Sequence, residues 1–408
     1  MRQSCLVPPD SFTQMWGDLA AIGRDARTGG YHRPGWSVAE QDCVRWFGAQ
    51  ARARDLRLNE DGNGNRVAWW GEPTDGGVVT GSHLDSVPDG GAFDGPLGVV
   101  SALAAVDRMR VAGVRPVRPV GVAVFVEEEG SRFGKPCLGS RLLTGALGAA
   151  EAAALRDGDG YALPDTMAAA GVEPDLGPSD LLRSPAAFVE LHVEQGRALV
   201  HADAPVGVAS AIWPHGRWRF DFTGRADHAG TTAMSDRCDP MLTCAMTVLA
   251  ANKQARLVDA RATVGRLDVT PGGTNAIASR VRAWLDARAP DDATLHQLVD
   301  AVAHQAGARA ERDGTSLAVE IESLTARVDF PVALRDRLVA LLAGVPVLAT
   351  GAGHDAGVLA AAGVPAAMLF VRNPTGVSHA PGEYAEPADC EAGVQALTAV
   401  LTDLASRP

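Results

Sequence analysis

Short runs of apolar residues recur along the first half and the end of the chain and predict buried strands. The clearest runs are Val78–Ser82, Val120–Val126, Phe188–Val193, Val345–Ala349 and Pro365–Val371. Continuous hydrophobicity of this kind is typical of parallel strands that are covered on both faces. Helical patterns lie between them, over Gly95–Arg110, with Val99, Leu103 and Val106 on one face, and over His354–Ala362. This alternation predicts an α/β sheet wound with helices.

The middle of the chain follows a different pattern. Polar and apolar residues alternate over Arg217–Thr223, Arg280–Arg288 and Ser316–Glu322. Alternation of this kind is typical of an antiparallel sheet with one solvated face. Two amphipathic helical patterns, roughly Asp239–Lys253 and Asp291–Arg312, accompany these strands. We therefore expect an inserted α+β domain over residues 211–324, and a first domain made of residues 1–210 and 325–408.

The overall composition narrows the classes of protein that the chain can belong to. Its 408 residues suit two domains, and its net charge of −12 disfavours a surface for nucleic acid or anionic membrane. A small carboxylate remains a suitable ligand, because one local arginine can hold it. The six scattered cysteines form no C-x-x-C pair, which favours reduced thiols.

No targeting or membrane segment is apparent either. The start, MRQSCLVPPD, lacks the apolar run of a signal peptide. The least polar stretch, Gly357–Val371, is too short to cross a bilayer and contains Pro365. We expect a cytoplasmic protein.

Histidines and carboxylates gather where strands are predicted to end. They are His83 and Asp85 in GSHLD, Asp94 in GGAFDGPLG, Glu127–Glu129 after VGVAVFV, His192 in ELHVEQG, and His379 in VSHAPGEY. Ligand crevices in open parallel sheets lie beyond the carboxyl ends of strands, and hydrolytic metal sites use these residue types. Taken singly, each residue also fits a structural role, such as a loop histidine, a helix N-cap aspartate, an acidic turn or a core histidine.

Two local arrangements could also carry chemistry. His83 could bind a metal ion while Asp85 holds its second ring nitrogen. Three adjacent glutamates at the end of a buried strand repel one another unless they share a cation or a proton. One of them could then bind a metal ion and its neighbour could act as the general base.

The same residues lie in sequence blocks that resemble, in order, those of the hydantoinase/carbamoylase amidohydrolases. The blocks are GSHLDSVPDGGAFDG, EEEGSRFG, ELHVEQG, GRADHAGTTAM, TNAIASR, GAGHDA and SHAPGE. The resemblance runs from about residue 15 to the C-terminus. That family includes allantoate amidohydrolases, N-carbamoyl-L-amino acid hydrolases and β-ureidopropionases. The resemblance implies a mixed sheet wound with helices, like that of metal-dependent exopeptidases, and an inserted domain that serves as lid and dimer interface.

The resemblance also implies a site for two divalent metal ions per subunit. Asp94 would bridge the two ions, His83 and His192 would complete one site, and Glu129 and His379 would complete the other. Zn²⁺ or Mn²⁺ are expected first, and Co²⁺ or Ni²⁺ also suit such ligands.

Catalytic and substrate-binding roles follow from the same resemblance. Glu128 would be the general base, although a shift of one residue would move the base and the ligand to Glu127 and Glu128. His228 would reach the active site of the partner subunit in a homodimer. The residues that would contact the substrate are Gln195, Asn275 and Arg288. An ion pair between Asp286 and Arg288 on one strand face is the alternative for Arg288.

These features together predict a metal-dependent amidohydrolase. It would cleave the C–N bond of a carbamoyl or ureido group on a small carboxylate, allantoate or an N-carbamoyl-L-amino acid, and release ammonia. The alternatives are an aminoacylase- or dipeptidase-like hydrolase of N-acyl amino acids, and a dimer that binds ligand or metal without catalysis.

Overall fold

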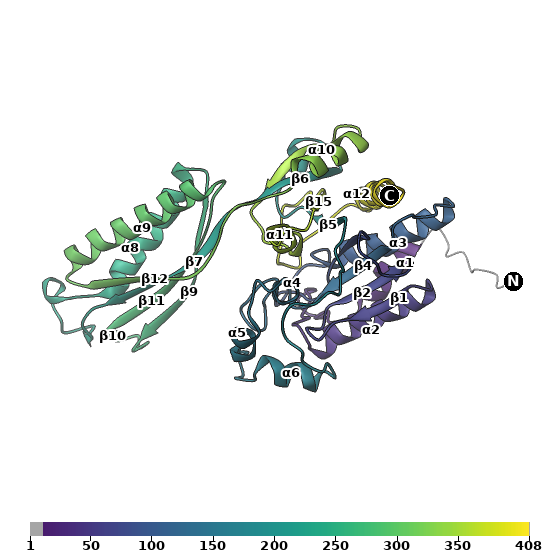
Figure 1. Cartoon of the computed structure of the whole chain (residues 1–408). Coiled ribbons are helices and arrows are strands. Elements are labelled where there is room, and N and C mark those ends of the chain that lie inside the picture. Colours follow the sequence, from purple (N-terminus) through teal and green to yellow (C-terminus); the bar gives the residue numbers. More distant parts are fainter. Residues whose placement is uncertain (1–10, 408) are drawn as a thin grey trace. The chain divides into compact units, whose positions relative to one another are not determined.

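The computed structural model describes residues 11–407, and the chain forms two compact units (Figure 1). Unit 1 runs to Ala211 and resumes at Asp329, and unit 2 comprises Ile212–Val328. The sequence predicts an inserted domain over residues 211–324, and unit 2 spans Ile212–Val328. The N-terminal decapeptide, including Cys5, lies outside the described residues.

A nine-stranded mixed sheet forms the centre of unit 1. Eight strands follow the order β1-β2-β4-β3-β5-β15-β6-β13, and β14 pairs with β6. Their bounds are β1 Arg57–Glu60, β2 Arg66–Trp70, β3 Val78–His83, β4 Val120–Phe125, β5 Ala187–Val193, β6 Val206–Ile212, β13 Val328–Asp329, β14 Val347–Thr350 and β15 Ala366–Val371. The central strands β4, β3, β5 and β15 are parallel, whereas β2 pairs antiparallel with β1 and β4, and β6 pairs antiparallel with β15.

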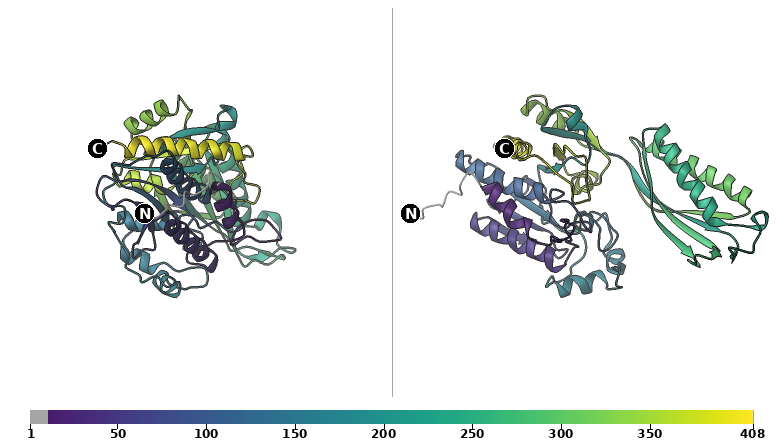
Figure 2. Two further views of the ribbon diagram at one scale, coloured as in Figure 1. Left: turned by 90° about the vertical axis from the view of Figure 1, so that its right-hand side faces the viewer. Right: turned by 180° about the vertical axis from the view of Figure 1, so that it is seen from behind.

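Helices pack against this sheet and complete an α/β architecture. The fold class predicted from the sequence is thereby confirmed. Their bounds are α1 Ser11–Ala20, α2 Val38–Ala53, α3 Pro96–Val111, α4 Leu138–Thr144, α5 Ala149–Ala154, α6 Leu163–Ala169, α7 Ala198–His201, α10 Val332–Leu341, α11 Asp355–Ala361 and α12 Pro387–Ala405. Helix α3 contacts β3 and β5 on one side, and α1 and α12 on others (Figure 2). It is therefore buried nearly all round, not only along the face of Val99, Leu103 and Val106 that the sequence suggested.

For one of the predicted buried strands, the prediction of burial is wrong. The apolar run at Val345–Ala349 forms β14, but Val347 is 45% exposed and only Thr350 in the strand is buried. Strand β14 pairs with β6 beside the main strand order, so it lacks the cover that helices give the central strands. The sequence run predicts the strand, whereas its burial depends on its neighbours.

Unit 2 consists of antiparallel strands with two long helices on one face of the larger sheet (Figure 1). Its elements are β7 His215–Thr223, β8 Asp227–His228, a 3₁₀ turn Met234–Asp236, α8 Pro240–Leu257, β9 Arg261–Thr270, β10 Ala276–Ile277, β11 Arg280–Arg288, α9 Asp292–Asp313 and β12 Ser316–Thr325. The four-stranded sheet has the order β12-β7-β11-β9, and β8 pairs with β10. Asp239 and Asp291 cap α8 and α9, because their carboxylates accept N–H groups of the first turns.

The predicted alternation holds for the two central strands of unit 2 and fails at its edge. Buried and less buried residues alternate along β7 and β11. Strand β12 lies at the edge of the sheet and is largely exposed, with Ile321 at 59%. Its pairing with β7 is also interrupted between Ile321 and Ser323, which disturbs the two-residue repeat.

Two further expectations concern the cysteines and the membrane. The described cysteines, Cys43, Cys137, Cys238, Cys244 and Cys390, are all unpaired. Across residues 11–407, no helix combines the length and the apolarity that crossing a membrane requires.

Candidate metal centre

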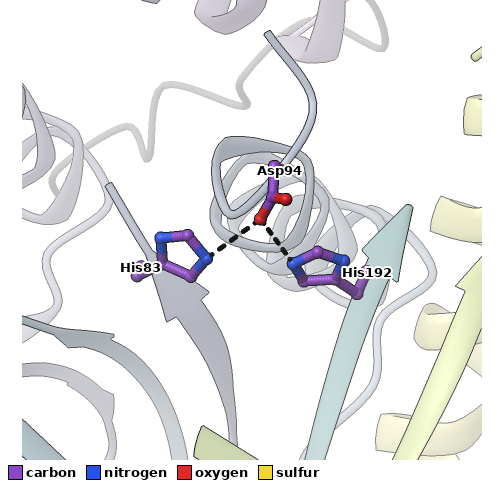
Figure 3. Close-up of side chains that lie close together, drawn as sticks. All are labelled: His83, Asp94 and His192. Atoms are coloured by element: carbon purple, nitrogen blue, oxygen red, sulfur yellow. Dashed lines mark ion pairs between the residues drawn. The ribbon is translucent and has the colours of Figure 1, made fainter. Parts of the chain in front are cut away.

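Two neighbouring parallel strands and one turn bring His83, His192 and Asp94 together. His83 ends β3, His192 lies near the end of β5, and Asp94 lies in the turn before α3. The turn passes close to the His83 ring, since a Cβ on Gly95 would lie 2.5 Å from His83 Nδ1. Asp94 Oδ1 lies 3.3 Å from His83 Nε2 and 3.1 Å from His192 Nε2 (Figure 3).

The other oxygen of Asp94 faces a different pair of side chains. Asp94 Oδ2 lies 3.4 Å from His379 Nε2, and the same nitrogen lies 3.4 Å from Glu129 Oε2. Ligand-type atoms of His83, Asp94 and His192 lie within 4.8 Å of one another, as do those of Asp94, Glu129 and His379. Asp94 is thus shared by two groups, each of which has the spacing of a metal-ligand set.

The two buried histidines have the hydrogen-bonding pattern of metal ligands. His83 Nε2 and His192 Nε2 face Asp94 but have no hydrogen-bond partner among residues 11–407. Their other ring nitrogens are held, His83 Nδ1 by Asp85 at 3.3 Å and His192 Nδ1 by the carbonyl oxygen of Val193 at 2.9 Å. A metal-binding histidine typically uses one nitrogen for the ion and donates the other N–H to a carboxylate or carbonyl. The residues present therefore fit divalent cations.

Burial and close charges shift the pKa values in this centre strongly. Burial alone would lower the pKa of His83, but Glu128, Asp85 and Asp94 together hold it well above its usual range. The pKa of Asp94 is well below its usual range, because His192, His379 and His83 outweigh its burial. Burial and the neighbouring Asp94 raise the pKa of Glu129 to about 7. A cation bound among these carboxylates would offset their mutual repulsion.

Of the three adjacent glutamates, Glu127 points to backbone donors. Its carboxylate accepts N–H groups from Gly35 at 2.9 Å, Arg132 at 2.7 Å and Phe133 at 2.9 Å. Its φ of 52° is in the left-handed region, which turns the chain sharply after β4. These contacts favour a structural role for Glu127.

Glu128 and Glu129 instead face the histidines. Glu128 Oε2 lies 3.7 Å from His83 Nε2, and Glu129 contacts His379 as described above. Asp85 accepts the backbone N–H groups of Glu128 and Glu129 at 3.2 and 3.1 Å. Asp85 therefore holds the His83 ring and the turn of the two glutamates at once.

Gln195 lies in the same centre. Its Nε2 donates to Asp94 Oδ2 at 2.6 Å and to Ser378 Oγ at 3.1 Å. The sequence resemblance implied that Gln195 contacts the substrate, and in this structure it contacts the shared carboxylate directly.

The remaining predicted residues, His228, Asn275 and Arg288, belong to unit 2. Exposed His228 accepts the N–H groups of Gly230 and Thr231 on Nδ1, at 3.0 and 3.1 Å. Ala276 pairs with His228 across β10 and β8, so Asn275 lies next to this short ladder. The pair that the sequence offered as an alternative is present, since Arg288 Nε donates to Asp286 Oδ1 at 2.9 Å.

Sequence reasoning missed a group of buried polar residues beside His192. Glu190 accepts hydrogen bonds from Ser82 Oγ at 2.7 Å and from the Ala356 N–H at 3.1 Å. Its ligand-type atoms lie close to those of His192 and His354. The His354 ring centroid lies 4.5 Å from that of His192. The alternation of strand faces could have revealed Glu190, which lies two residues before His192 on the same face of β5.

Two further contacts of the centre were also missed. Cys137 Sγ donates to Glu128 Oε1 at 3.3 Å. Glu383 accepts backbone N–H groups of Phe93 and Asp94. Glu383 ends the SHAPGE block that contributed His379, so considering more than one residue in each block would have found it.

The chain is similar to known proteins over nearly its whole length. The model of Peptidase family M20/M25/M40 matches residues 79–403. An N-carbamoyl-L-amino acid amidohydrolase of Geobacillus stearothermophilus is 36% identical, over 96% of this chain and 98% of that protein. An allantoate amidohydrolase of Bacillus subtilis is 32% identical, over 80% of this chain and 81% of that protein.

Solved structures show the same similarity. A hydantoinase/carbamoylase family amidase from Burkholderia vietnamiensis has a TM-score of 0.89 at 30% identity, and the alignment covers 100% of both chains. The resemblance predicted from seven sequence blocks is thereby confirmed. This chain belongs to Peptidase family M20/M25/M40 and, within it, to the hydantoinase/carbamoylase amidases, which are hydrolases that act on C–N bonds.

Proposed function

We propose that this hydrolase cleaves the C–N bond of a carbamoyl or ureido group on a small carboxylate and releases ammonia. Allantoate and N-carbamoyl-L-amino acids are the substrates that we expect. The observation that carries the proposal is Asp94, whose two oxygens face two separate ligand groups, in a chain whose relatives include amidohydrolases of both compounds.

The ligand groups support a site for two divalent metal ions. His83 and His192 would hold one ion, Glu129 and His379 the other, and Asp94 would contact both. When bound, such ions polarise a carbonyl group and lower the pKa of a water molecule, which makes it a nucleophile near neutral pH. Zn²⁺ and Mn²⁺ are the first candidates, and Co²⁺ and Ni²⁺ also suit nitrogen and carboxylate ligands.

Glu128 would act as the general base. Its Oε2 lies toward His83 and its Oε1 accepts the thiol of Cys137, so both oxygens are oriented. Burial raises its pKa well above the usual range, which makes the carboxylate a better proton acceptor than a free glutamate. It would take a proton from the attacking water and then give it to the leaving nitrogen.

Residues of unit 2 would bind the substrate. Arg288 and Asn275 would hold the substrate carboxylate, and Arg288 would then exchange its ion pair with Asp286 for a pair with the substrate. His228 would stabilise the oxyanion that forms at the carbonyl, and in a homodimer it would be supplied by the partner subunit. Unit 2 would thus serve as lid and dimer interface.

A substrate panel tests the proposed reaction. The purified protein, reconstituted with Zn²⁺ or Mn²⁺, is incubated with allantoate, N-carbamoyl-L-amino acids, N-carbamoyl-β-alanine, N-acetyl amino acids and dipeptides. We expect ammonia from a ureido or carbamoyl compound, and its loss with a chelator. Free amine without ammonia would instead identify an aminoacylase- or peptidase-like enzyme.

Replacing Glu128 with Gln tests the assignment of the base. Glutamine cannot accept the proton, so we expect turnover to fall by at least about 10²–10⁴-fold. The metal content should stay unchanged, because Glu128 is not one of the proposed ligands. Glu127→Gln is the matched control, and a larger loss in that variant would shift the assignment by one residue.

A further inference from the structure

We propose that Glu383 is a positioning residue that fastens the loop of Asp94 to the loop of His379, so that the two halves of the metal centre form as one unit. This inference rests on the proposed function, since it assumes that both loops supply metal ligands. Glu383 itself does not lie in any of the three ligand groups found among the described residues.

The carboxylate of Glu383 holds the backbone of the Asp94 loop. Glu383 is only 4% exposed, and its Oε1 accepts the N–H groups of Phe93 at 2.7 Å and Asp94 at 2.8 Å. Hydrogen bonds from backbone N–H groups to a carboxylate are among the stronger ones in proteins. They fix the peptide units on both sides of the Phe93 Cα, and thereby the direction in which Asp94 leaves the backbone.

The packing around Gly91 shows how closely the loop follows Glu383. A Cβ added at Gly91 would lie 2.4 Å from Glu383 Cδ and 2.5 Å from Glu383 Cβ. Gly91 is not among the glycines with positive φ, so its backbone would tolerate alanine. The requirement for glycine therefore comes from the close approach of Glu383 to the loop.

The same segment carries His379 to the other oxygen of Asp94. The N–H of Glu383 donates to the carbonyl oxygen of Ala380 at 3.0 Å, which closes the turn that follows His379. Ser378 Oγ donates to Asp94 Oδ2 at 3.3 Å. The segment thus holds the Asp94 loop at two places, through its backbone by Glu383 and at its carboxylate by Ser378.

The other carboxylate oxygen of Glu383 makes no such contact. Glu383 Oε2 is buried and has no hydrogen-bond partner among residues 11–407. Burial of a polar atom without a partner costs free energy. Burial and the nearby Asp94 also raise the pKa of Glu383 to about 7.

The experiment measures metal affinity rather than activity. Zn²⁺ is titrated into the metal-free full chain by calorimetry for the wild type, Glu383→Ala and Glu383→Gln. We expect Glu383→Ala to weaken Zn²⁺ binding by about 10–100-fold, as is typical when a residue that orients a ligand is removed. Glu383→Gln keeps a carbonyl oxygen for the two N–H groups and should retain most of the affinity.

Two more variants keep the test decisive. Gly91→Ala leaves Glu383 in the chain but displaces it, and should weaken Zn²⁺ binding as Glu383→Ala does. Asp389→Asn is the control, because Asp389 is 3% exposed, pairs with Arg372 at 2.8 Å in the same C-terminal segment, and contacts no proposed ligand. It should lower the melting temperature while leaving Zn²⁺ affinity unchanged.

The outcomes separate this inference from the proposed function. Wild-type Zn²⁺ affinity in Glu383→Ala or in Gly91→Ala would overturn the positioning role. Equal losses of affinity in Asp389→Asn and Glu383→Ala would do so as well, since general destabilisation would then suffice. A wild type that binds Zn²⁺ but releases no ammonia from any ureido compound would refute the proposed reaction and leave the role of Glu383 standing.

Discussion

At the scale of single residues, the shared carboxylate of Asp94 decides what the centre can bind. Each of its oxygens faces its own histidine group, and His83 Nε2 and His192 Nε2 have no hydrogen-bond partner in the described part of the chain. A side chain with one oxygen acceptor could serve only one of the two groups. The proposed binding of two metal ions would therefore depend on this residue.

Asp94→Asn should lower the metal content and the activity together. The amide offers one oxygen and no charge, so we expect at most one tightly bound ion per subunit. Activity should fall on the order of 10³-fold, because stabilisation of several kcal/mol is lost. Elemental analysis after desalting measures the metal content, and two ions per subunit in the variant would contradict the bridging role.

Cys137 should affect catalysis without affecting binding. Its thiol donates to Glu128 Oε1 at 3.3 Å, so Cys137→Ala removes one contact that orients the proposed base. A hydrogen bond is typically worth about 1 kcal/mol, and we expect kcat to fall about fivefold to tenfold with KM and metal content unchanged. Cys137→Ser retains a donor and should recover most of the rate. Equal rates for the alanine variant and the wild type would show that the contact is not needed.

At the scale of elements, α2 contains a group that makes stability depend on pH. Glu40 in its first turn is buried and accepts the Trp36 N–H at 3.1 Å, and burial raises its pKa to about 7 from an ordinary value of 4.5. The folded state thus binds this proton more tightly than the unfolded state. The resulting stability is complete below about pH 4.5 and is lost as the pH rises through 7.

Glu40→Gln should remove this dependence. Between pH 5 and pH 8, the free energy of unfolding of the wild type should fall relative to that of the variant, by on the order of 3 kcal/mol. Other buried acids contribute equally to both proteins, so their effects cancel in the difference. Urea unfolding at the two pH values measures it, and a difference that does not change with pH would show that Glu40 is ionised throughout.

Sequence patterns predicted elements better than they predicted burial. The runs that became β3, β4, β5 and β15 are mainly apolar, and every residue of these central strands is buried. The same kind of run became the exposed β14, since a run cannot report which strand lies beside it. Strand β2 has only five residues, most of them buried within the sheet, and the sequence patterns did not predict it.

The candidate site shows the same limit. The sequence resemblance named Asp94 and His379 because each stands out in its block. It missed Glu383, whose contact with Asp94 joins residues 289 positions apart. The SHAPGE block contains Glu383, but its contact with Asp94 arises from tertiary packing, and no local pattern reports such a contact.

At the scale of the whole molecule, the two units have separate cores and only one contains the proposed ligands. Metal ions that bind the folded unit 1 stabilise it by mass action, by about 4 kcal/mol at a free concentration 1,000 times Kd. Calorimetry should therefore resolve two unfolding transitions, of which Zn²⁺ raises one and leaves the other unchanged. A common shift of both transitions would show that the units unfold together.

The place of β15 in the sheet has a consequence for how the protein is made. Strand β15 lies between β5 and β6, yet it is synthesised after all of unit 2. While the chain leaves the ribosome, unit 2 can fold from contiguous sequence, whereas the sheet of unit 1 stays open between β5 and β6. Exposed strand edges recruit other chains, so nascent or truncated protein that ends before Val371 should aggregate or occupy chaperones. The proposed metal centre, which would also include His379, would then form only in the last moments of synthesis.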